Sequence, residues 1–279
     1  MMLTEEYVKN LLPQRKPEAH KGDFGRVLLL CGSVGYTGAA CMAARAAVRC
    51  GAGLVYVGVP ETVYPIVAGK LDEPMVFPLP AEYGKLSSGA AKWISEMLPK
   101  MDAVLVGPGM GQSEGVDECV MLVLQEAKCP VVLDADGINT ISRHIDVLRE
   151  SACPVVVTPH PGEFRRLGGD LSMGREEAAK ALAKDLNCIC LLKGHDSVIT
   201  DGETVHVNPT GNPGMATGGS GDVLAGMLTA LAGQGLPLLE AASAAAWLHG
   251  KAGDLCAAEL GQYGMLPTDM IEVLPRLLP

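Results

Sequence analysis

The sequence Gly211-Asn-Pro-Gly-Met-Ala-Thr-Gly-Gly-Ser-Gly-Asp222 decides how this chain is organised, together with the apolar run 223–231 behind it. Five glycines stand between Gly211 and Gly221, and the apolar run predicts a helix. A glycine-rich turn ahead of a helix presents unpaired backbone N–H groups at the positive end of the helix dipole, where anions bind. The stretch lacks the Gly-x4-Gly-Lys-Ser/Thr pattern of a Walker A loop, so it predicts a phosphate site of another type.

Asp222 ends the stretch and has two interpretations. A carboxylate in the first turn of a helix is stabilised by the dipole, so Asp222 can be a helix-start acid. It can also be a general base beside a bound phosphate, where it takes up a proton. On either interpretation we expect the helix dipole to keep Asp222 ionised.

Short apolar runs separated by helical patterns predict the rest of the fold. The predicted strands are 26–31, 54–59, 75–78, 102–106, 130–133, 154–157 and 188–192, followed by a hairpin of 198–200 and 204–207 around the turn pair Asp201-Gly202. The predicted helices are 38–50, 87–98, 116–126, 175–186 and 238–260, after a helix-poor arm at 3–24. This alternation predicts a three-layer α/β/α sandwich with a mainly parallel central sheet. No linker divides the chain, so we expect a single domain over residues 1–279.

Polar and glycine-rich segments follow the predicted strands and should therefore share the carboxyl edge of the sheet, where ligands bind in open α/β folds. These segments are Gly32–Gly38, Gly107–Gly111, Asp134–Asn139, His160–Glu163, Lys193–Ser197 and Gly218–Asp222. The first one is spaced Gly-x-x-Gly-x-x-Gly and not Gly-x-Gly-x-x-Gly, so it is a weak indication of a dinucleotide-binding Rossmann unit.

Composition excludes several classes of protein. Hydrophobic residues make up 48% and charged residues 19%, which is typical of a folded globular chain. The formal net charge of −10 argues against a nucleic-acid or anionic-membrane partner. No apolar run reaches the ~18 residues of a membrane span, and the start lacks a secretory signal pattern. Nine cysteines without a Cys-x-x-Cys pair indicate reduced thiols in a cytoplasmic protein.

Six motifs in order carry a resemblance to a known family. They are Gly35-Tyr-Thr-Gly-Ala39, Gly107-Pro-Gly-Met-Gly111, Leu133-Asp-Ala-Asp-Gly137, Thr158-Pro-His-Pro-Gly-Glu163, Leu192-Lys-Gly194 and Thr217-Gly-Gly-Ser-Gly-Asp222. Over about residues 20–275 the chain resembles the NAD(P)H-hydrate dehydratases, which have the ribokinase-like fold. The resemblance implies a metabolite-repair lyase that returns the S epimer of hydrated NADH or NADPH to NAD(P)H. It also implies ADP or ATP as phosphoryl donor, Mg²⁺, a homotetramer, and a stand-alone dehydratase with no room for the epimerase domain of some relatives.

The same resemblance implies roles for particular residues. Asp222 is the expected catalytic base, and the expected contacts of the hydrated dinucleotide are Ala39, Gly109, His160 and Asp222. The expected nucleotide contacts are Lys193, Gly194, His195, Asp196, Ser197, Gly218, Gly219, Ser220 and Gly221. Glu163 matches a family acid near the metal and phosphates. The preceding Pro161-Gly162 indicates equally that Glu163 is a helix-start acid.

Other polar residues keep two interpretations. Lys193, at a strand end, either pairs a nucleotide phosphate or stands in solvent, with the phosphate favoured. Asp134 and Asp136 are strand-end caps or metal-shell acids, with caps favoured. We expect His249 to be packed in an apolar helix, and His195 and His206 to be solvated near the hairpin.

The leading hypothesis is dehydration through phosphorylation of the ring hydroxyl and loss of phosphate, because phosphate leaves far more easily than hydroxide. In-line positioning, charge stabilisation and a proton acceptor are what such a transfer needs. The alternative is a small-molecule kinase of the same fold that acts on a vitamin-precursor alcohol. A nucleotide-binding sensor without turnover is disfavoured by the intact Asp222.

Overall fold

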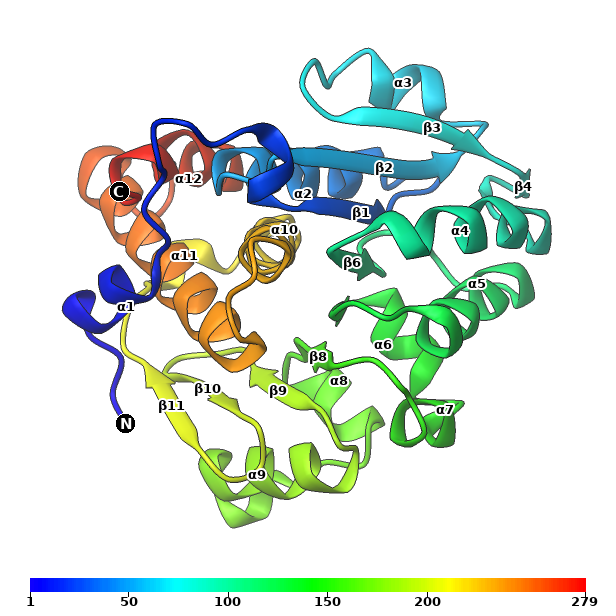
Figure 1. The fold of residues 1–279 in the computed structure, drawn as a ribbon. Helices are drawn as coiled ribbons and strands as arrows, with labels where there is room; N and C mark the ends of the chain where they lie inside the picture. The colour runs from blue at the N-terminus through cyan, green and yellow to red at the C-terminus, as the bar shows by residue number, and fades with distance from the viewer.

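The computed structural model describes residues 1–279, in which helices cover both faces of a nine-stranded sheet (Figure 1). The strands are β1 (Arg26–Leu30), β2 (Leu54–Pro60), β3 (Met75–Leu79), β6 (Ala103–Val106), β7 (Val131–Leu133), β8 (Val155–Val157), β9 (Ile189–Leu192), β10 (Ser197–Thr200) and β11 (Val205–Asn208), with β4 (Ala81–Glu82) and β5 (Lys85–Leu86) in a separate hairpin. Their order is β11-β10-β9-β8-β7-β6-β1-β2-β3, and only the two pairings made by β10 are antiparallel. The predicted three-layer sandwich with a mainly parallel sheet is confirmed.

Twelve α-helices connect or flank these strands. They are α1 (Glu5–Leu11), α2 (Thr37–Arg49), α3 (Tyr64–Ala68), α4 (Ala91–Met97), α5 (Glu114–Glu126), α6 (Asp136–Ile141), α7 (Ile145–Arg149), α8 (Pro161–Arg166), α9 (Arg175–Asp185), α10 (Ser220–Gly233), α11 (Leu238–Leu260) and α12 (Pro267–Val273). The five predicted helices correspond to α2, α4, α5, α9 and α11. The helix expected after Asp222 is α10, which also includes the glycine-rich residues Ser220 and Gly221.

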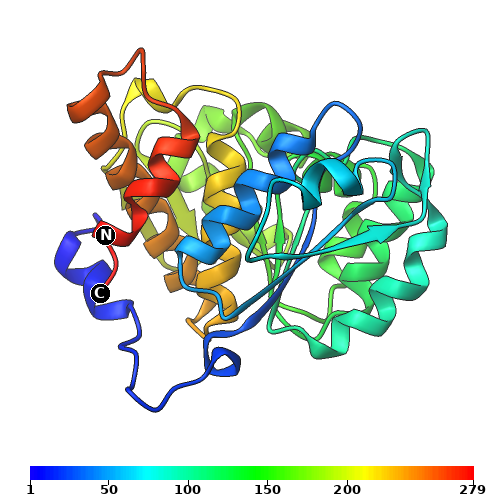
Figure 2. The same ribbon diagram turned by 90° about the horizontal axis from the view of Figure 1, so that it is seen from above.

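Alternating side chains of the strands divide the core into two layers. In β1, Val27 and Leu29 join the layer formed with α2, α10 and α11, whereas Leu28 and Leu30 join the layer formed with α4, α5 and α9. The first layer is rich in alanine, so its helices approach closely. A Cβ at Gly226 of α10 would lie 2.1 Å from a carbonyl oxygen of α2. Because α10 packs directly under the centre of the sheet, its amino end is brought to the carboxyl edge of the strands (Figure 2).

Two predictions about the ends of the sheet need correction. The register Thr200↔Val205 leaves a four-residue loop, not a tight Asp-Gly turn. The loop is closed by the Asp201 carboxylate, which accepts the N–H groups of Glu203 and Thr204 at 2.9 and 2.7 Å. The amino-terminal arm does contain a helix, α1, which stops before Pro13. The arm also pairs with β11, since the N–H of Leu3 donates to a β11 carbonyl.

No helix of the structure has the length and apolar character that would let it cross a membrane.

Candidate active site

The carboxyl ends of five neighbouring strands collect the segments that the sequence placed there. Lys193 follows β9, His160 follows β8, Asp134 follows β7, Gly107 follows β6 and Ser33 lies just beyond β1. Contacts between the segments join them along this edge, as the following paragraphs describe. The prediction that these segments share one edge is therefore confirmed.

Lys193 is the charged centre of the edge. Its ammonium group lies 2.7 Å from the Asp134 carboxylate and 3.9 Å from that of Glu163. The hydroxyl of Thr158 also donates to Asp134, at 2.7 Å. Burial opposes the charged lysine, but the carboxylates of Asp134, Glu163 and Asp222 outweigh it, so the pKa of Lys193 is raised. The Lys193 ammonium group is therefore fixed by its ion pairs, which excludes the interpretation that Lys193 stands in solvent. Asp134 is its ion-pair partner and not a strand-end cap.

The start of α10 lies directly against this cation. A Cβ at Gly221 would lie 3.6 Å from the Lys193 nitrogen and 3.9 Å from an Asp134 oxygen. The backbone N–H groups of Gly218, Gly219, Gly221 and Asp222 make no hydrogen bond within the protein. Free N–H groups at the positive end of a helix, with a lysine beside them, form an arrangement that binds phosphate.

Asp222 has an unusual proton affinity. Burial and the Asp134 carboxylate raise its pKa and the Lys193 cation lowers it, which together bring the pKa to about 7. With a pKa of about 7 the carboxyl is only partly ionised near neutral pH, so the expectation that the helix dipole keeps Asp222 ionised holds only above that pH. Desolvation and the like charge of Asp134 outweigh the helix dipole, although Asp222 lies in the first turn of α10, where the dipole favours a carboxylate. A carboxyl with a pKa near 7 is well matched to take up and release a proton at neutral pH.

Ala39 and Gly109 are brought together at the β1 end of the edge. Gly109 has φ +63°, and a Cβ there would lie 2.9 Å from the Ala39 Cβ and 2.8 Å from the Tyr36 Cβ. The Ser33 hydroxyl donates to the Gly109 carbonyl at 2.7 Å, which fixes the two loops to each other. The glycine is thus required by both its backbone conformation and the space around it.

His160 and Glu163 form the amino cap of α8. The ring Nδ1 of His160 accepts the N–H groups of Gly162 and Glu163, at 2.9 and 3.3 Å, while the Glu163 carboxylate accepts the N–H of His160 at 2.8 Å. This reciprocal cap shows the helix-start role of Glu163. The Nε2 of His160, on a half-exposed side chain, lies 3.5 Å from the Glu163 carboxylate. Contact of His160 with a substrate stays a prediction.

The segment after β9 is open to solvent beyond Lys193. The side chain of His195 is 94% exposed and pairs with Asp196 at 3.1 Å, and the Ser197 hydroxyl donates to the Gly194 carbonyl at 2.9 Å. Sequence reasoning missed Arg175 of α9, whose guanidinium donates to the carbonyls of Leu192 and Lys193 at 3.0 and 3.2 Å. Nothing in the motif pattern points to this residue, because it lies outside the six motifs, at the start of the helix before β9. The nucleotide contacts assigned to residues 193–197 stay predictions.

Asp136 behaves as a structural acid. Its carboxylate accepts the N–H of Gly111 at 2.8 Å and the side-chain amide of Asn139 at 3.3 Å. Together with the ion pair of Asp134 and the cap formed by Glu163, this leaves no group of three His, Cys, Asp or Glu side chains placed to hold a metal ion. The residues therefore do not provide a preformed cage for Mg²⁺.

The histidines outside the edge differ from one another. His249 of α11 is buried as expected, at 7% exposure, and burial lowers its pKa to about 4. The expectation that His206 is solvated is wrong. His206 lies in β11 against α11, only 4% exposed, and its Nδ1 lies 2.8 Å from the Ser243 hydroxyl.

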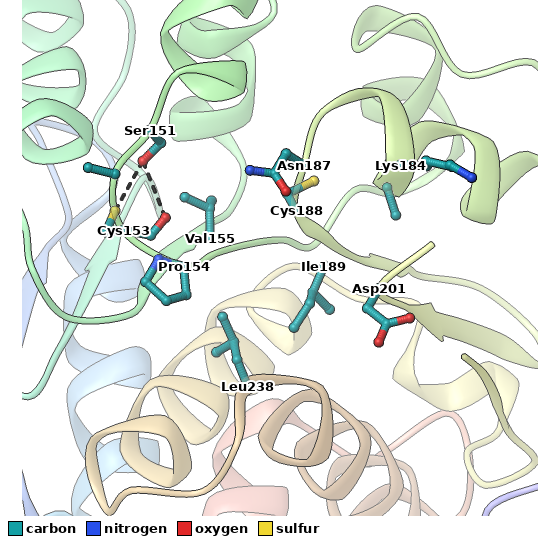
Figure 3. Close-up of a pocket in the computed structure, with 12 residues that line it drawn as sticks. Ser151, Cys153, Pro154, Val155, Lys184, Asn187, Cys188, Ile189, Asp201 and Leu238 are labelled. Atoms are coloured by element: carbon teal, nitrogen blue, oxygen red, sulfur yellow. Dashed lines mark hydrogen bonds between the residues drawn. The ribbon is translucent and has the colours of Figure 1, made fainter. Parts of the chain in front are cut away.

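A groove also lies on the opposite side of the sheet. Figure 3 shows this groove of about 460 Å³ between the segments that lead into β8 and β9, lined by Cys153, Asn187, Cys188, Asp201 and Leu238 among others. It is at the amino ends of the strands, opposite Lys193 and Asp222. We place the candidate site at the carboxyl edge, because the free N–H groups, the held cation and the shifted carboxyl are all there.

Comparisons with known proteins show the family of this chain. The model of the NAD(P)H-hydrate dehydratase family matches residues 27–276. The bifunctional NAD(P)H-hydrate repair enzyme Nnr of Moorella thermoacetica is 43% identical over 99% of this chain, and the chain spans 53% of that relative. The ADP-dependent (S)-NAD(P)H-hydrate dehydratase of Bacillus subtilis is 37% identical over 98% of this chain and 96% of its own length. The chain thus spans about half the length of the bifunctional relatives and nearly all of the Bacillus enzyme.

Solved structures give the same fold. The ADP/ATP-dependent NAD(P)H-hydrate dehydratase of Bacillus subtilis, co-crystallised with ATP/Mg²⁺, superposes with a TM-score of 0.83 and 34% identity, covering 98% of this chain and 96% of that one. A ribokinase-like superfamily protein of Enterococcus faecalis has a TM-score of 0.87 and 27% identity, with coverage of 99% and 94%. The fold of this chain is therefore ribokinase-like.

Proposed function

The chain belongs to the NAD(P)H-hydrate dehydratase family, and from that premise we propose that it is a metabolite-repair lyase. It dehydrates the S epimer of hydrated NADH or NADPH at the expense of ADP or ATP. The observation that supports this most directly is the position of Asp222, whose pKa is about 7, among four free backbone N–H groups and close to the Lys193 cation.

Phosphoryl transfer is the first step of the proposed reaction. The hydroxyl oxygen of the hydrated ring attacks the terminal phosphorus of the nucleotide, the bond to the bridging oxygen breaks, and AMP or ADP leaves. Asp222 accepts the hydroxyl proton. The N–H groups of Gly218, Gly219 and Gly221 stabilise the charge on the transferring group.

Loss of phosphate is the second step. The lone pair of the ring nitrogen expels inorganic phosphate from the neighbouring carbon, and the resulting iminium loses a proton from the adjacent ring carbon. This restores the double bond of the dihydronicotinamide. Each turnover then consumes one nucleotide and releases one phosphate and one NAD(P)H.

Lys193 holds the nucleotide in this proposal, together with residues 194–197. Its ion pair with Asp134 keeps the ammonium group in place at the amino end of α10. A phosphate that approaches the free N–H groups gains the same cation as a partner. Ala39, Gly109 and His160 would contact the dinucleotide. Magnesium would be carried mainly by the nucleotide phosphates, with Glu163 as the nearest candidate ligand, and no step is assigned to the metal.

The test is an assay of hydrated NADPH with ADP or ATP that follows recovery of reduced-nicotinamide absorbance and release of phosphate. Equimolar recovery and release supports the proposal. Nucleotide consumption that requires a vitamin-precursor alcohol and not the hydrate would instead support the small-molecule kinase. Nucleotide binding without turnover would support a sensor.

Assembly and location complete the proposal. Nine free cysteines, eight of them buried, suit a reducing compartment such as the cytoplasm. The homotetramer implied by the family stays a prediction, which light scattering of the purified protein measures directly.

A further inference from the structure

Three loops are tied together at the β1 end of the carboxyl edge. The N–H of Gly32 donates to the Pro108 carbonyl at 2.8 Å, and the N–H of Val34 donates to the Gly84 carbonyl in the β4–β5 turn at 2.9 Å. The Lys85 ammonium group donates to the Gln112 carbonyl at 3.0 Å. The loop after β1, the loop after β6 and the β4–β5 hairpin therefore form one connected wall, and Figure 2 shows the blue loop that leads into α2 on this edge.

Tyr36 stands on this wall with its backbone fixed and its ring open to solvent. Its N–H donates to the Ser33 carbonyl at 2.9 Å, and its carbonyl accepts the N–H of Ala39 at 3.2 Å. Its Cβ covers Gly109, as described above, yet the residue is 61% exposed. Aromatic residues make up only 4% of this chain. An anchored, exposed ring next to two expected substrate contacts is a ready stacking platform.

The order of the strands indicates which ligand reaches Tyr36. The turn before Asp222 lies between α2, which follows β1, and the end of β7, because a Cβ at Gly219 would lie 2.6 Å from Met42 and a Cβ at Gly221 would lie 3.9 Å from Asp134. The nucleotide donor takes the β9 side, where Lys193 and the loop behind it lie. A dinucleotide whose hydrated ring lies beside Asp222 must then extend toward β1 and β2. Tyr36 follows β1, which is two strands, or about 10 Å, from β7.

We infer that Tyr36 is a specificity-determining residue that stacks on the purine base of the dinucleotide substrate. This inference rests on the proposed function. The hydrated dihydronicotinamide ring is not aromatic, whereas the purine is planar and presents a π-face. Stacking between a base and an aromatic side chain tolerates different bases and depends on the ring, not on the hydroxyl.

The experiment compares Tyr36→Ala, Tyr36→Phe and the matched control Tyr83→Ala, an exposed tyrosine on the neighbouring turn. Tyr36→Ala should raise the KM for hydrated NADPH about 10- to 100-fold, or about 1.4 to 2.7 kcal/mol. It should leave kcat and the KM for ADP within about twofold. Tyr36→Phe and Tyr83→Ala should stay close to wild type. With hydrated reduced nicotinamide mononucleotide, which has no purine, the penalty of Tyr36→Ala should vanish.

Two outcomes would overturn the inference. A rise in KM that persists with the mononucleotide would mean that Tyr36 contacts the reacting ring. An unchanged KM in Tyr36→Ala would mean that Tyr36 does not contact the substrate. Binding of unreacted NADPH to wild type and Tyr36→Ala, measured by calorimetry, tests the stacking without turnover. A wild-type protein that binds NADPH through Tyr36 but does not dehydrate the hydrate would refute the proposed function alone.

Discussion

The ammonium group of Lys193 lies 2.7 Å from the carboxylate of Asp134, and this ion pair joins the ends of β9 and β7 across the end of β8. Asp134 is only 2% exposed, so its charge depends on the lysine and on the Thr158 hydroxyl for compensation. The pair thus stabilises the site and positions a cation beside the free N–H groups of α10.

Lys193→Ala should therefore have two effects. The apparent KM for the nucleotide should rise about 10- to 150-fold, since a charge-assisted contact is worth about 1.5–3 kcal/mol. The thermal midpoint should also fall, because removal of one partner leaves a buried charge uncompensated. Steady-state kinetics and calorimetry on the same preparation measure both. Lys184→Ala is the control, because that lysine is 77% exposed and its loss should change neither quantity. An unchanged KM in Lys193→Ala would remove the lysine from nucleotide binding.

The pH profile should report Asp222. If it is the base, kcat/KM should rise about tenfold per pH unit below about 7 and level off above, since the ionised form acts. The charge of Asp134 raises this pKa and that of Lys193 lowers it. The acid limb should therefore move to lower pH in Asp134→Asn and to higher pH in Lys193→Ala. A flat profile between pH 5 and about 8 would contradict this assignment.

The sheet was predictable because its strands are continuous apolar runs. Five of the helices that flank it were predictable because they have a clear helical pattern. The short helices α3, α6, α7, α8 and α12 were missed, because five to seven residues give too little periodicity. The buried state of His206 was missed for a different reason. Its burial comes from α11, which packs on β11 from a distant part of the sequence.

The candidate site was predictable at the level of segments and not of electrostatics. The carboxyl ends of parallel strands lie at one edge of a sheet whatever the details of packing. The grouping of Lys193, Asp134 and Asp222 therefore followed from the positions of polar segments after the predicted strands. The pKa of Asp222 did not, because it depends on burial and on a neighbour 88 positions away in the sequence. Arg175 could not be found because it lies outside the six motifs, at the start of the helix before β9.

Gly221→Ala should fold and yet bind nucleotide less well. A Cβ there has no contact under 3.6 Å, but it would point at the Lys193 nitrogen and narrow the phosphate site. We expect the thermal midpoint to stay within about 2 °C and the nucleotide KM to rise at least about tenfold. Gly218→Ala is the matched control, because nothing lies within 4 Å of its Cβ. Equal KM values for the two variants would place the phosphate elsewhere.

His249→Leu should leave the protein as stable as wild type or stabilise it by about 1 kcal/mol. The Nε2 of His249 is buried without a hydrogen-bond partner in the protein, and we expect this cost to outweigh the interaction of the ring with the Ser220 backbone. Leucine fills a similar space without that penalty, whereas His249→Ala leaves a cavity and should destabilise by about 2 kcal/mol or more. Urea denaturation measures all three. A large loss in His249→Leu would show that the imidazole makes a stabilising bond.

Asp222→Asn should separate catalysis from stability. Asparagine is tolerated at a helix start and nearly preserves the shape, so the variant should fold. Turnover should fall by about 10²–10⁴, the usual contribution of a positioned base, with little change in nucleotide affinity because the free N–H groups remain.

The stability of Asp222→Asn relative to wild type should also change with pH, and its direction follows from the pKa of Asp222. The pKa of Asp222 is raised on folding from 3.8 to about 7, so the stability that comes from the protonated carboxyl is present below about 3.8. That contribution is lost as the pH rises through about 7. Asparagine cannot ionise, so the thermal midpoint of the variant relative to wild type should increase from pH 5 to about 8. Near wild-type turnover in a folded variant would contradict a catalytic role of Asp222. A thermal midpoint below that of wild type at every pH would favour a structural role.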